Sequence, residues 1–368
     1  MATMYRAEVI GSLLRPGYLK DARKVWEAGQ LSTPEFKRIE DRAVNEMLTL
    51  QETAGVDIVT DGEMRRTHFV GPLWDVLEGF SAIPAPVVQW HEQSPDEVIE
   101  RRIPACVTGK LRRRRSLTME EFAYARGRTD KPLKMTLPSP LMLALWWSPE
   151  HSTVAYRDAF ALFADAVDIL RQEVSELASL GCTYIQIDAP ELATLVDPSH
   201  QQGTFAARGI APERILTEGL ELMNAVADAP GVTFGLHLCR GNNQGRWMAH
   251  GGYEAISKQV FQHASRYEIF LLEYDNWRSG SFEPLADVPR DKQVVLGLVS
   301  SKTNTLEPTE GLIARIEEAS RYFPREQMAL STQCGFASVM QGNPIAEATQ
   351  VAKLRLVADT AHRMWAGN

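Results

Sequence analysis

The sequence has 368 residues, of which 39 are Lys or Arg and 47 are Asp or Glu, so the formal net charge at pH 7 is −8. This acidic balance opposes binding to nucleic acid or anionic lipid, and because we find neither an uncharged apolar run of about 18 residues nor a signal-peptide core, we expect no membrane span and no leader. Four Cys are too few for a disulfide framework in a chain of this length, so we expect reduced thiols and a cytoplasmic protein.

The predicted elements alternate between strands and helices. The first helix is the clearest, because Ser32-Thr-Pro-Glu35 forms a capping box, an apolar stripe of helical spacing covers 36–54, and Gly55 follows as a stop. The predicted strands cover 7–12, 56–63, 133–140, 182–191, 232–239, 269–275, 293–301 and 327–335. The later helices are expected around 163–177, 212–227, 253–264, 308–321 and 345–366.

Strands that alternate with helices predict a parallel sheet. Eight such strands favour an α/β fold of the (β/α)8 TIM-barrel type, with a doubly wound open sheet as the alternative. We find no linker that divides the chain, so we expect residues 1–368 to form one barrel domain. The longest connection, residues 80–131 after the second strand, should form an elaboration on the C-terminal face of the barrel.

Each predicted strand ends in a polar cluster, at the edge where barrels of this type carry their active sites. His237 and Cys239 lie two residues apart at the end of the fifth strand, so both side chains should point to the same face. Glu273 lies at the end of the sixth strand and Cys334 at the end of the eighth. Zinc takes Cys, His and carboxylate ligands in a tetrahedral shell, so these four residues form a candidate Zn²⁺ site.

Several motifs resemble the catalytic barrel of cobalamin-independent methionine synthase, and most closely the single-barrel methionine-synthase-like proteins. The motifs are HLCRGN (237–242), FLLEYDN (270–276), VLGLVSSK (295–302), LSTQCGFAS (330–338), IGSLLRP (10–16), VTDGEMRR (59–66) and IDAPELA (187–193). The resemblance is weakest across 80–131. It implies a (β/α)8 fold, a catalytic zinc on the four residues named above, and a homocysteine site made by Ser12, Glu63 and Asp188.

The resemblance also implies the chemistry, which is transfer of a methyl group to a thiol, most simply homocysteine, to give methionine. A free thiol is mostly protonated at neutral pH, whereas a metal-bound thiol is deprotonated. Because four protein ligands fill a tetrahedron, the substrate thiol must displace one of them or expand the shell, and Glu273 is our candidate for displacement. The partners expected are therefore a small thiol and a methyl donor; the sequence does not indicate the oligomeric state.

The candidate methyl donor is 5-methyltetrahydrofolate, whose leaving nitrogen needs a proton. Lys302 is our candidate catalytic acid, because it follows the seventh strand at a position where the family keeps a His or Lys. Many relatives have an Asp just before that residue, but this chain reads Ser300-Ser301-Lys302, so the usual partner carboxylate is missing.

Less specific interpretations remain open for the proposed ligands. Cys239 and Cys334 could instead be small apolar residues of the core, and His237 could be a core histidine that is hydrogen-bonded to the backbone. Glu273 could instead form a salt bridge inside the barrel, and Asp275 would then be the metal ligand. Cys106 and Cys182 are expected to be structural.

The proposed substrate residues and the overall function also have alternatives. Glu63 and Asp188 could pair with nearby arginines, and Arg65 and Arg66 are available to Glu63. The run 112–115 fits a solvated loop better than a site for a folate tail. The alternative functions are a related zinc barrel that alkylates another thiol, a carbon–sulfur lyase of the same superfamily, and a non-catalytic zinc- or thiol-binding barrel.

Overall fold

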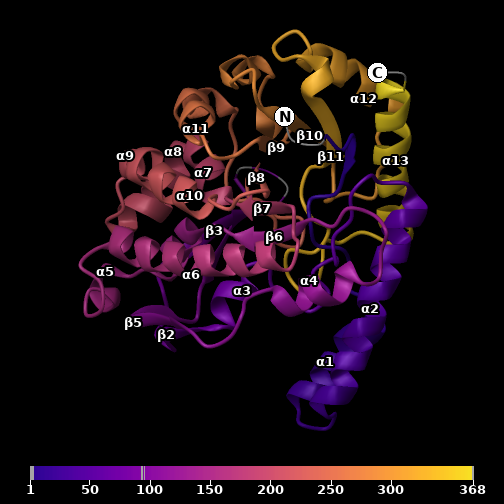
Figure 1. The fold of residues 1–368 in the computed structure, drawn as a ribbon. Coiled ribbons are helices and arrows are strands. Elements are labelled where there is room, and N and C mark those ends of the chain that lie inside the picture. The colour runs from indigo at the N-terminus through magenta and orange to yellow at the C-terminus, as the bar shows by residue number, and fades with distance from the viewer. Residues whose placement is uncertain (1–3, 93, 95, 367–368) are drawn as a thin grey trace.

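The computed structural model describes residues 4–92, 94 and 96–366, and its parallel strands lie inside a layer of helices (Figure 1). Seven parallel strands are hydrogen-bonded in the order β1–β11–β10–β9–β8–β7–β6. Their bounds are β1 (Ala7–Glu8), β6 (Met135–Pro138), β7 (Tyr184–Asp188), β8 (Thr233–Leu238), β9 (Ile269–Glu273), β10 (Gln293–Val299) and β11 (Met328–Thr332). The expectation of a parallel α/β barrel is confirmed.

The segment 57–59 lies between β1 and β6, the two ends of this sheet. Asp57 N donates to Ala7 O of β1 (2.9 Å), and Val59 N donates to Pro132 O beside β6 (3.0 Å). Val59 also forms a parallel bridge with Leu133. The ring of strands is therefore closed, which rules out the doubly wound open sheet.

The expected regular strand over 56–63 is wrong, because its backbone pairs only in part and side chains supply other contacts there. The Asp57 carboxylate accepts from the backbone N–H of Arg6 (2.8 Å) and Ala7 (2.9 Å). The Gln51 side chain donates to Thr60 O (2.8 Å) and accepts from Thr60 N (3.0 Å). A hydrophobic run in the sequence cannot show that side-chain amide and carboxylate groups form hydrogen bonds that backbone groups form in a regular strand.

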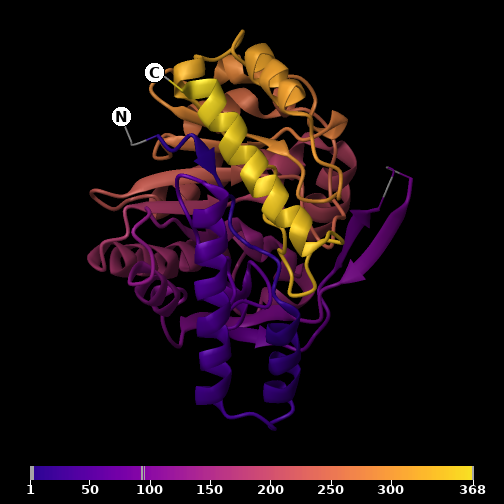
Figure 2. The same ribbon diagram turned by 90° about the vertical axis from the view of Figure 1, so that its right-hand side faces the viewer.

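Helices cover the outside of the barrel, and the main ones match the predictions. In α2 (Thr33–Ala54) the capping box of Ser32 and Glu35 is present, and Gly55 ends the helix at φ 89°. Three further long helices are α6 (Ala159–Ser179), α12 (Thr309–Ala319) and α13 (Glu347–Trp365), and two helices of seven residues are α10 (Leu220–Val226) and α11 (Ser257–His263). The short ones are α3 (Gly71–Trp74), α5 (Pro149–Ser152), α7 (Pro190–Ala193), α8 (Pro198–His200) and α9 (Pro212–Arg214). We did not predict α1 (Gly17–Glu27), which forms with α2 a hairpin that extends from the body (Figure 2).

The expected elaboration is built from two antiparallel strand pairs and a helix. The pairs join β2 (Leu77–Ser81) to β5 (Cys106–Arg113) and β3 (Val87–His91) to β4 (Val98–Arg102), and the helix is α4 (Met119–Arg126). His91 of β3 bridges to Trp247 after β8, and the two rings stack with centroids 4.3 Å apart. Because this contact joins β3 to the chain beyond the C-terminal end of β8, the elaboration lies at the mouth of the barrel. In the described part of the chain, no helix is long and apolar enough to cross a membrane.

Arg15 joins three chain segments beneath the mouth of the barrel. Its side chain is buried, and its guanidinium donates to Glu63 O (2.8 Å), Arg66 O (3.0 Å) and Ala337 O. A buried carbonyl group that loses its hydrogen-bond donor destabilises the folded protein, because the group has left water without gaining a partner. Arg15 therefore fixes the loop that carries Glu63 against the segment that follows Cys334.

We predict that Arg15→Met lowers the free energy of unfolding by roughly 3 kcal/mol or more, because at least three buried carbonyl groups lose their donor. Urea denaturation followed by circular dichroism measures this change. Arg38→Met on the exposed face of α2 is the matched control and should change stability by less than about 0.5 kcal/mol. Equal effects of the two substitutions would contradict the role given to Arg15.

Candidate metal centre and active-site cavity

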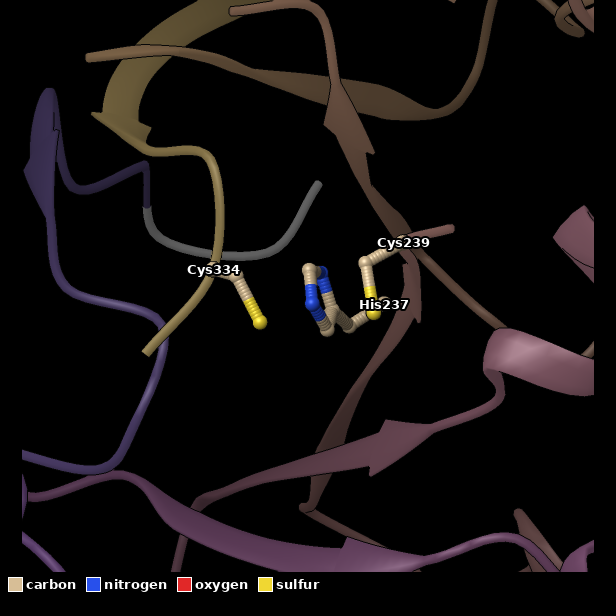
Figure 3. Close-up of side chains that lie close together, drawn as sticks. All are labelled: His237, Cys239 and Cys334. Carbon is tan, nitrogen blue, oxygen red and sulfur yellow. The ribbon is translucent and has the colours of Figure 1, made fainter. Parts of the chain in front are cut away.

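An imidazole and two thiols meet at the mouth of the barrel. Figure 3 shows His237 from β8, Cys239 just beyond it and Cys334 just beyond β11, with their side chains close together. All three are buried, and one ligand atom of each lies within 4.8 Å of the others. In a tetrahedral zinc shell with zinc–sulfur bonds of about 2.3 Å, two sulfur ligands lie about 3.8 Å apart. The cluster therefore needs little rearrangement to surround an ion.

The alternation of β8 explains why two of these residues face the same space. Leu236 and Leu238 belong to the apolar core beneath the helices, so His237 and Cys239 point to the interior of the barrel. In the neighbouring strand β9, Leu271 packs inside the barrel with Val295 of β10. The sequence prediction that His237 and Cys239 share a face agrees with this arrangement.

The contacts of His237 leave one ring nitrogen available. Nδ1 lies 3.3 Å from Leu271 O, and Nε2 is buried without a hydrogen-bond partner. A metal-binding histidine typically donates one ring N–H to a carbonyl or carboxylate and binds the ion through the other nitrogen. The unpartnered Nε2 thus fits a metal ligand better than a satisfied core histidine.

The two cysteines are an unfavourable pair as thiolates unless a cation lies between them. Contact with the Cys334 thiol and burial raise the pKa of Cys239 well above its ordinary value. Two adjacent buried thiolates repel one another, and a divalent cation removes that repulsion because a coordinated thiol is deprotonated. The donor set of one imidazole and two thiols therefore fits zinc.

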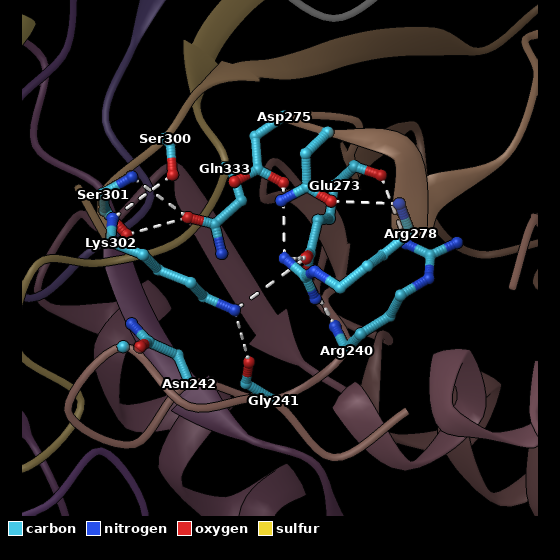
Figure 4. Close-up of polar contacts among 12 residues, drawn as sticks. Arg240, Gly241, Asn242, Glu273, Asp275, Arg278, Ser300, Ser301, Lys302 and Gln333 are labelled. Carbon is cyan, nitrogen blue, oxygen red and sulfur yellow. Dashed lines mark hydrogen bonds and ion pairs between the residues drawn. The ribbon is translucent and has the colours of Figure 1, made fainter. Parts of the chain in front are cut away.

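Glu273, the fourth predicted ligand, lies outside this group of three. Its Oε2 accepts from Arg240 N (2.6 Å) and its Oε1 accepts from the Arg278 guanidinium (3.1 Å), as Figure 4 shows. Burial alone would raise the pKa of Glu273, but Lys302, Arg278 and Arg240 outweigh burial and lower it to about 2. Glu273 is therefore an ionised carboxylate with its own hydrogen-bond partners, and its role as a ligand stays a prediction.

Lys302 belongs to the same buried group of charges. Its Nζ donates to Gly241 O (3.0 Å) and lies 4.0 Å from Glu273 Oε1. Asp275, the alternative ligand, is also in this group, with a carboxylate oxygen 3.6 Å from the Arg278 guanidinium. Asp275, two residues beyond β9, thus supplies a buried carboxylate near Lys302, in place of the carboxylate that is missing from the sequence at 300–302.

A cavity of about 970 Å³ opens beside the cluster. It brings together most of the residues that the sequence singled out. These lining residues are Ser12, Glu63, Asp188, His237, Cys239 and Cys334. Glu273, Lys302 and the arginines of 112–115 do not line it.

Glu63 is held in an uncommon backbone conformation at the cavity wall. Its φ is 55°, and its N–H donates to the Asp61 carboxylate (2.9 Å). Glu63 Oε1 accepts from Thr136 Oγ1 (2.8 Å) and lies 3.6 Å from the Arg66 guanidinium, while Oε2 is buried without a partner. A Cβ on Gly11 would lie 2.9 Å from Glu63 Oε1, so only glycine leaves room for this carboxylate. Strained, incompletely paired groups of this kind cluster at functional sites.

Asp188 and Ser12 complete the polar wall of the cavity. Gln186 donates to Asp188 Oδ1 (2.7 Å), and burial raises the pKa of Asp188 to about 6, although His237 acts in the opposite direction. Ser12 is buried, and its Oγ accepts weakly from Ala337 N (3.4 Å). Two carboxylates and a hydroxyl therefore face the same space as the cluster.

The sequence analysis missed several residues of the cavity wall. Asn242 lies in the RGN sequence directly after Cys239, and its Oδ1 is buried without a partner. His68 follows the GEMRR sequence, and burial lowers its pKa to about 4, so its ring is neutral. These two could have been found from their neighbours in sequence. The lining tryptophans could not, because they come from unrelated segments with no shared pattern; they are Trp74, Trp90 and Trp146.

The (β/α)8 barrel thus carries buried His and Cys donors and two carboxylates at its mouth, where barrels of this type have their active sites. The family model described as the catalytic domain of cobalamin-independent synthase matches residues 5–361. The chain belongs to this family and is a methionine-synthase-like catalytic domain. Methyl transfer is thus the class of chemistry that the family assignment supports.

Individual relatives agree with this assignment. The uncharacterized protein YxjH of Bacillus subtilis is 35% identical over 98% of this chain and 95% of its own length. The methionine synthase of Saccharolobus solfataricus is 26% identical over 89% of this chain and 86% of its own. Among solved structures, a putative vitamin-B12 independent methionine synthase from Listeria monocytogenes has a TM-score of 0.74 with 27% identity, and 99% of each chain is covered. The expected family and TIM-barrel fold are confirmed.

We predict that the purified protein binds one zinc ion per chain, and that Cys239→Ser and Cys334→Ser each abolish tight binding. Metal analysis after dialysis against zinc and then buffer measures the stoichiometry. Cys182→Ser, which changes a buried thiol outside the cluster, is the matched control and should retain the metal. Full zinc retention by both cluster variants would show that the ligands lie elsewhere.

Proposed function

We propose that the protein is a zinc-dependent methyltransferase that converts homocysteine to methionine. The observation that carries the proposal is the cluster of His237, Cys239 and Cys334, which opens on the same cavity as Glu63 and Asp188. When bound, zinc would keep the acceptor thiol in its nucleophilic thiolate form. Family membership supports methyl transfer as the reaction class.

The residues of the cavity wall account for recognition of an amino acid. An ammonium group that leaves water needs carboxylates to replace its hydration. Glu63 and Asp188 supply two, and the Glu63 oxygen without a partner is available to a ligand. Ser12 and the nearby backbone would bind the carboxylate of the same substrate. These groups would place the thiol of homocysteine toward the cluster.

The remaining cavity favours a large methyl donor. Pockets of about 300–1,000 Å³ hold drug-sized molecules, so a cavity of about 970 Å³ exceeds the needs of homocysteine. Its outer wall carries tryptophans and basic residues, and flat rings and anionic groups bind to such walls. The basic lining residues are Lys20, Arg23, Lys24, Arg101 and Arg102, and the acidic Asp21 and Glu27 line the same cavity. These features support 5-methyltetrahydrofolate, and a polyglutamate tail would lie along the basic side.

The direct test is methionine formation by the zinc-loaded protein from homocysteine and 5-methyltetrahydrofolate, as the mono- and the triglutamate. We expect turnover with both donors, and a lower KM for the triglutamate because its added carboxylates meet the basic wall. Arg101→Gln combined with Arg102→Gln should reduce the difference between the two donors. A zinc-loaded protein that forms no methionine from either donor would contradict the proposed donor and reaction.

Thiol selectivity gives a second test. We expect homocysteine to bind better than 4-mercaptobutyrate or 2-mercaptoethanesulfonate by about 1–3 kcal/mol, because the latter two leave the carboxylates without a cation. Glu63→Gln should reduce this preference while zinc stays bound. Glu121→Gln is the matched control, since Glu121 also pairs with Arg66 (2.7 Å) but does not line the cavity. Equal binding of the three thiols by the wild-type protein would favour a transferase for another thiol.

A further inference from the structure

The side-chain amide of Asn242, on the cavity wall, is held at one end and unpartnered at the other. Its Nδ2 donates to Gly335 O (2.8 Å), whereas its Oδ1 is buried and has no hydrogen-bond partner among the described residues. A reversed amide would set Oδ1 against the Gly335 carbonyl oxygen, and two acceptors repel one another. The contact with Gly335 therefore fixes Oδ1 as the unpartnered end.

The backbone at Asn242 is fixed as well. Figure 4 shows Asn242 next to Gly241, in the loop that follows Cys239. Gly241 has φ 87°, and a Cβ there would lie 2.8 Å from Met248 Cγ, so the turn before Asn242 requires glycine. The carbonyl oxygen of Asn242 accepts from Ser338 Oγ. Because a buried acceptor without a donor destabilises the protein, so firmly held an Oδ1 indicates a ligand that supplies the donor.

Gly335 joins the Asn242 amide to the proposed substrate residues. A Cβ on Gly335 would lie 3.0 Å from Ser12 N and would collide with Ser12 Oγ, so the two backbones are in close contact. Ser12 follows Gly11, where a Cβ would lie 2.9 Å from Glu63 Oε1. Asn242, Ser12 and Glu63 all line the cavity. The amide therefore lies at the end of the cavity that we assign to the amino acid.

The chemistry of the proposed substrate identifies the group that would meet Oδ1. Homocysteine bound as a thiolate has one hydrogen-bond donor, its ammonium group, because the sulfur and the carboxylate are then only acceptors. An ammonium group offers three N–H donors. The Glu63 carboxylate, with its unpartnered Oε2, and the Asp188 carboxylate can accept two of them. The Asn242 Oδ1 is available for the third.

We infer that Asn242 is a specificity-determining residue whose Oδ1 accepts an N–H of the substrate ammonium group. The inference rests on the proposed function and adds a neutral acceptor to its two carboxylates. A carboxylate attracts any cation, whereas a neutral acceptor stabilises only a group that brings an N–H donor. Asn242 would therefore make the site selective for an amino group as well as for positive charge.

The test compares the affinities of the zinc-loaded protein for homocysteine and for 4-mercaptobutyrate, measured by isothermal titration calorimetry. The two thiols differ only in the ammonium group, so the ratio of their dissociation constants reports its recognition. We expect Asn242→Ala to reduce this ratio by about tenfold, the effect of losing one hydrogen bond to a charged group. The loss should come from weaker binding of homocysteine, with 4-mercaptobutyrate bound as in the wild type.

Asn242→Asp separates the roles of the two ends of the amide. Like Asn242→Ala it removes the donor to Gly335 O, but it retains an acceptor oxygen, so the preference for homocysteine should be at least that of the wild type. Asn343→Ala is the matched control, because this buried amide has partners at both ends, Ser301 O (2.9 Å) and Gly245 N (3.0 Å), and does not line the cavity. Its loss should leave the ratio unchanged.

Two results overturn the inference while the proposed function stands. A wild-type ratio in Asn242→Ala is the first, and a higher KM for the methyl donor in that variant would then assign Oδ1 to the donor. An equal loss of preference in Asn242→Ala and Asn242→Asp is the second, because it would show an action through the contact with Gly335. A wild-type protein that binds the two thiols equally overturns the proposed amino-acid site, and this inference with it.

Discussion

The parallel register of the barrel strands is the constraint on which the site depends. Asp188 of β7 lies opposite His237 of β8, and Glu273 of β9 lies opposite Gly297 of β10. Because all strands of the barrel run in the same direction, their polar C-terminal ends open on one mouth. Cys239 beyond β8 and Cys334 beyond β11 can therefore share a cluster although they lie 95 positions apart in the sequence.

Around that mouth, the protein contains a buried ionised carboxylate and a strained backbone conformation, and each is unfavourable without specific partners. Burial of an ionised group is costly unless it is paired and hydrogen-bonded, and Glu273 has a backbone N–H, Arg278 and Lys302 as partners. Glu63 adopts a positive φ, which is uncommon for residues other than glycine. Both arrangements fix carboxylates near the cluster before any ligand binds, which is the preorganisation that catalysis requires.

The sequence predicts features that depend on local pattern. The capping box fixes the start of α2, alternation fixes the face of His237 and Cys239, and the strand ends bring the cavity residues together. Features that depend on distant side chains could not be predicted. Gln51 and Asp57 supplement the partial backbone pairing over 56–63, and the partners of Glu273 arrive from loops whose course the sequence does not specify.

We propose that the imidazole and two thiols at the barrel mouth bind a zinc ion directly. X-ray absorption at the zinc edge of the loaded protein tests this claim without depending on turnover. We expect two sulfur ligands at about 2.3 Å and at least one nitrogen ligand at about 2.0 Å. A zinc shell made only of nitrogen and oxygen atoms would contradict it.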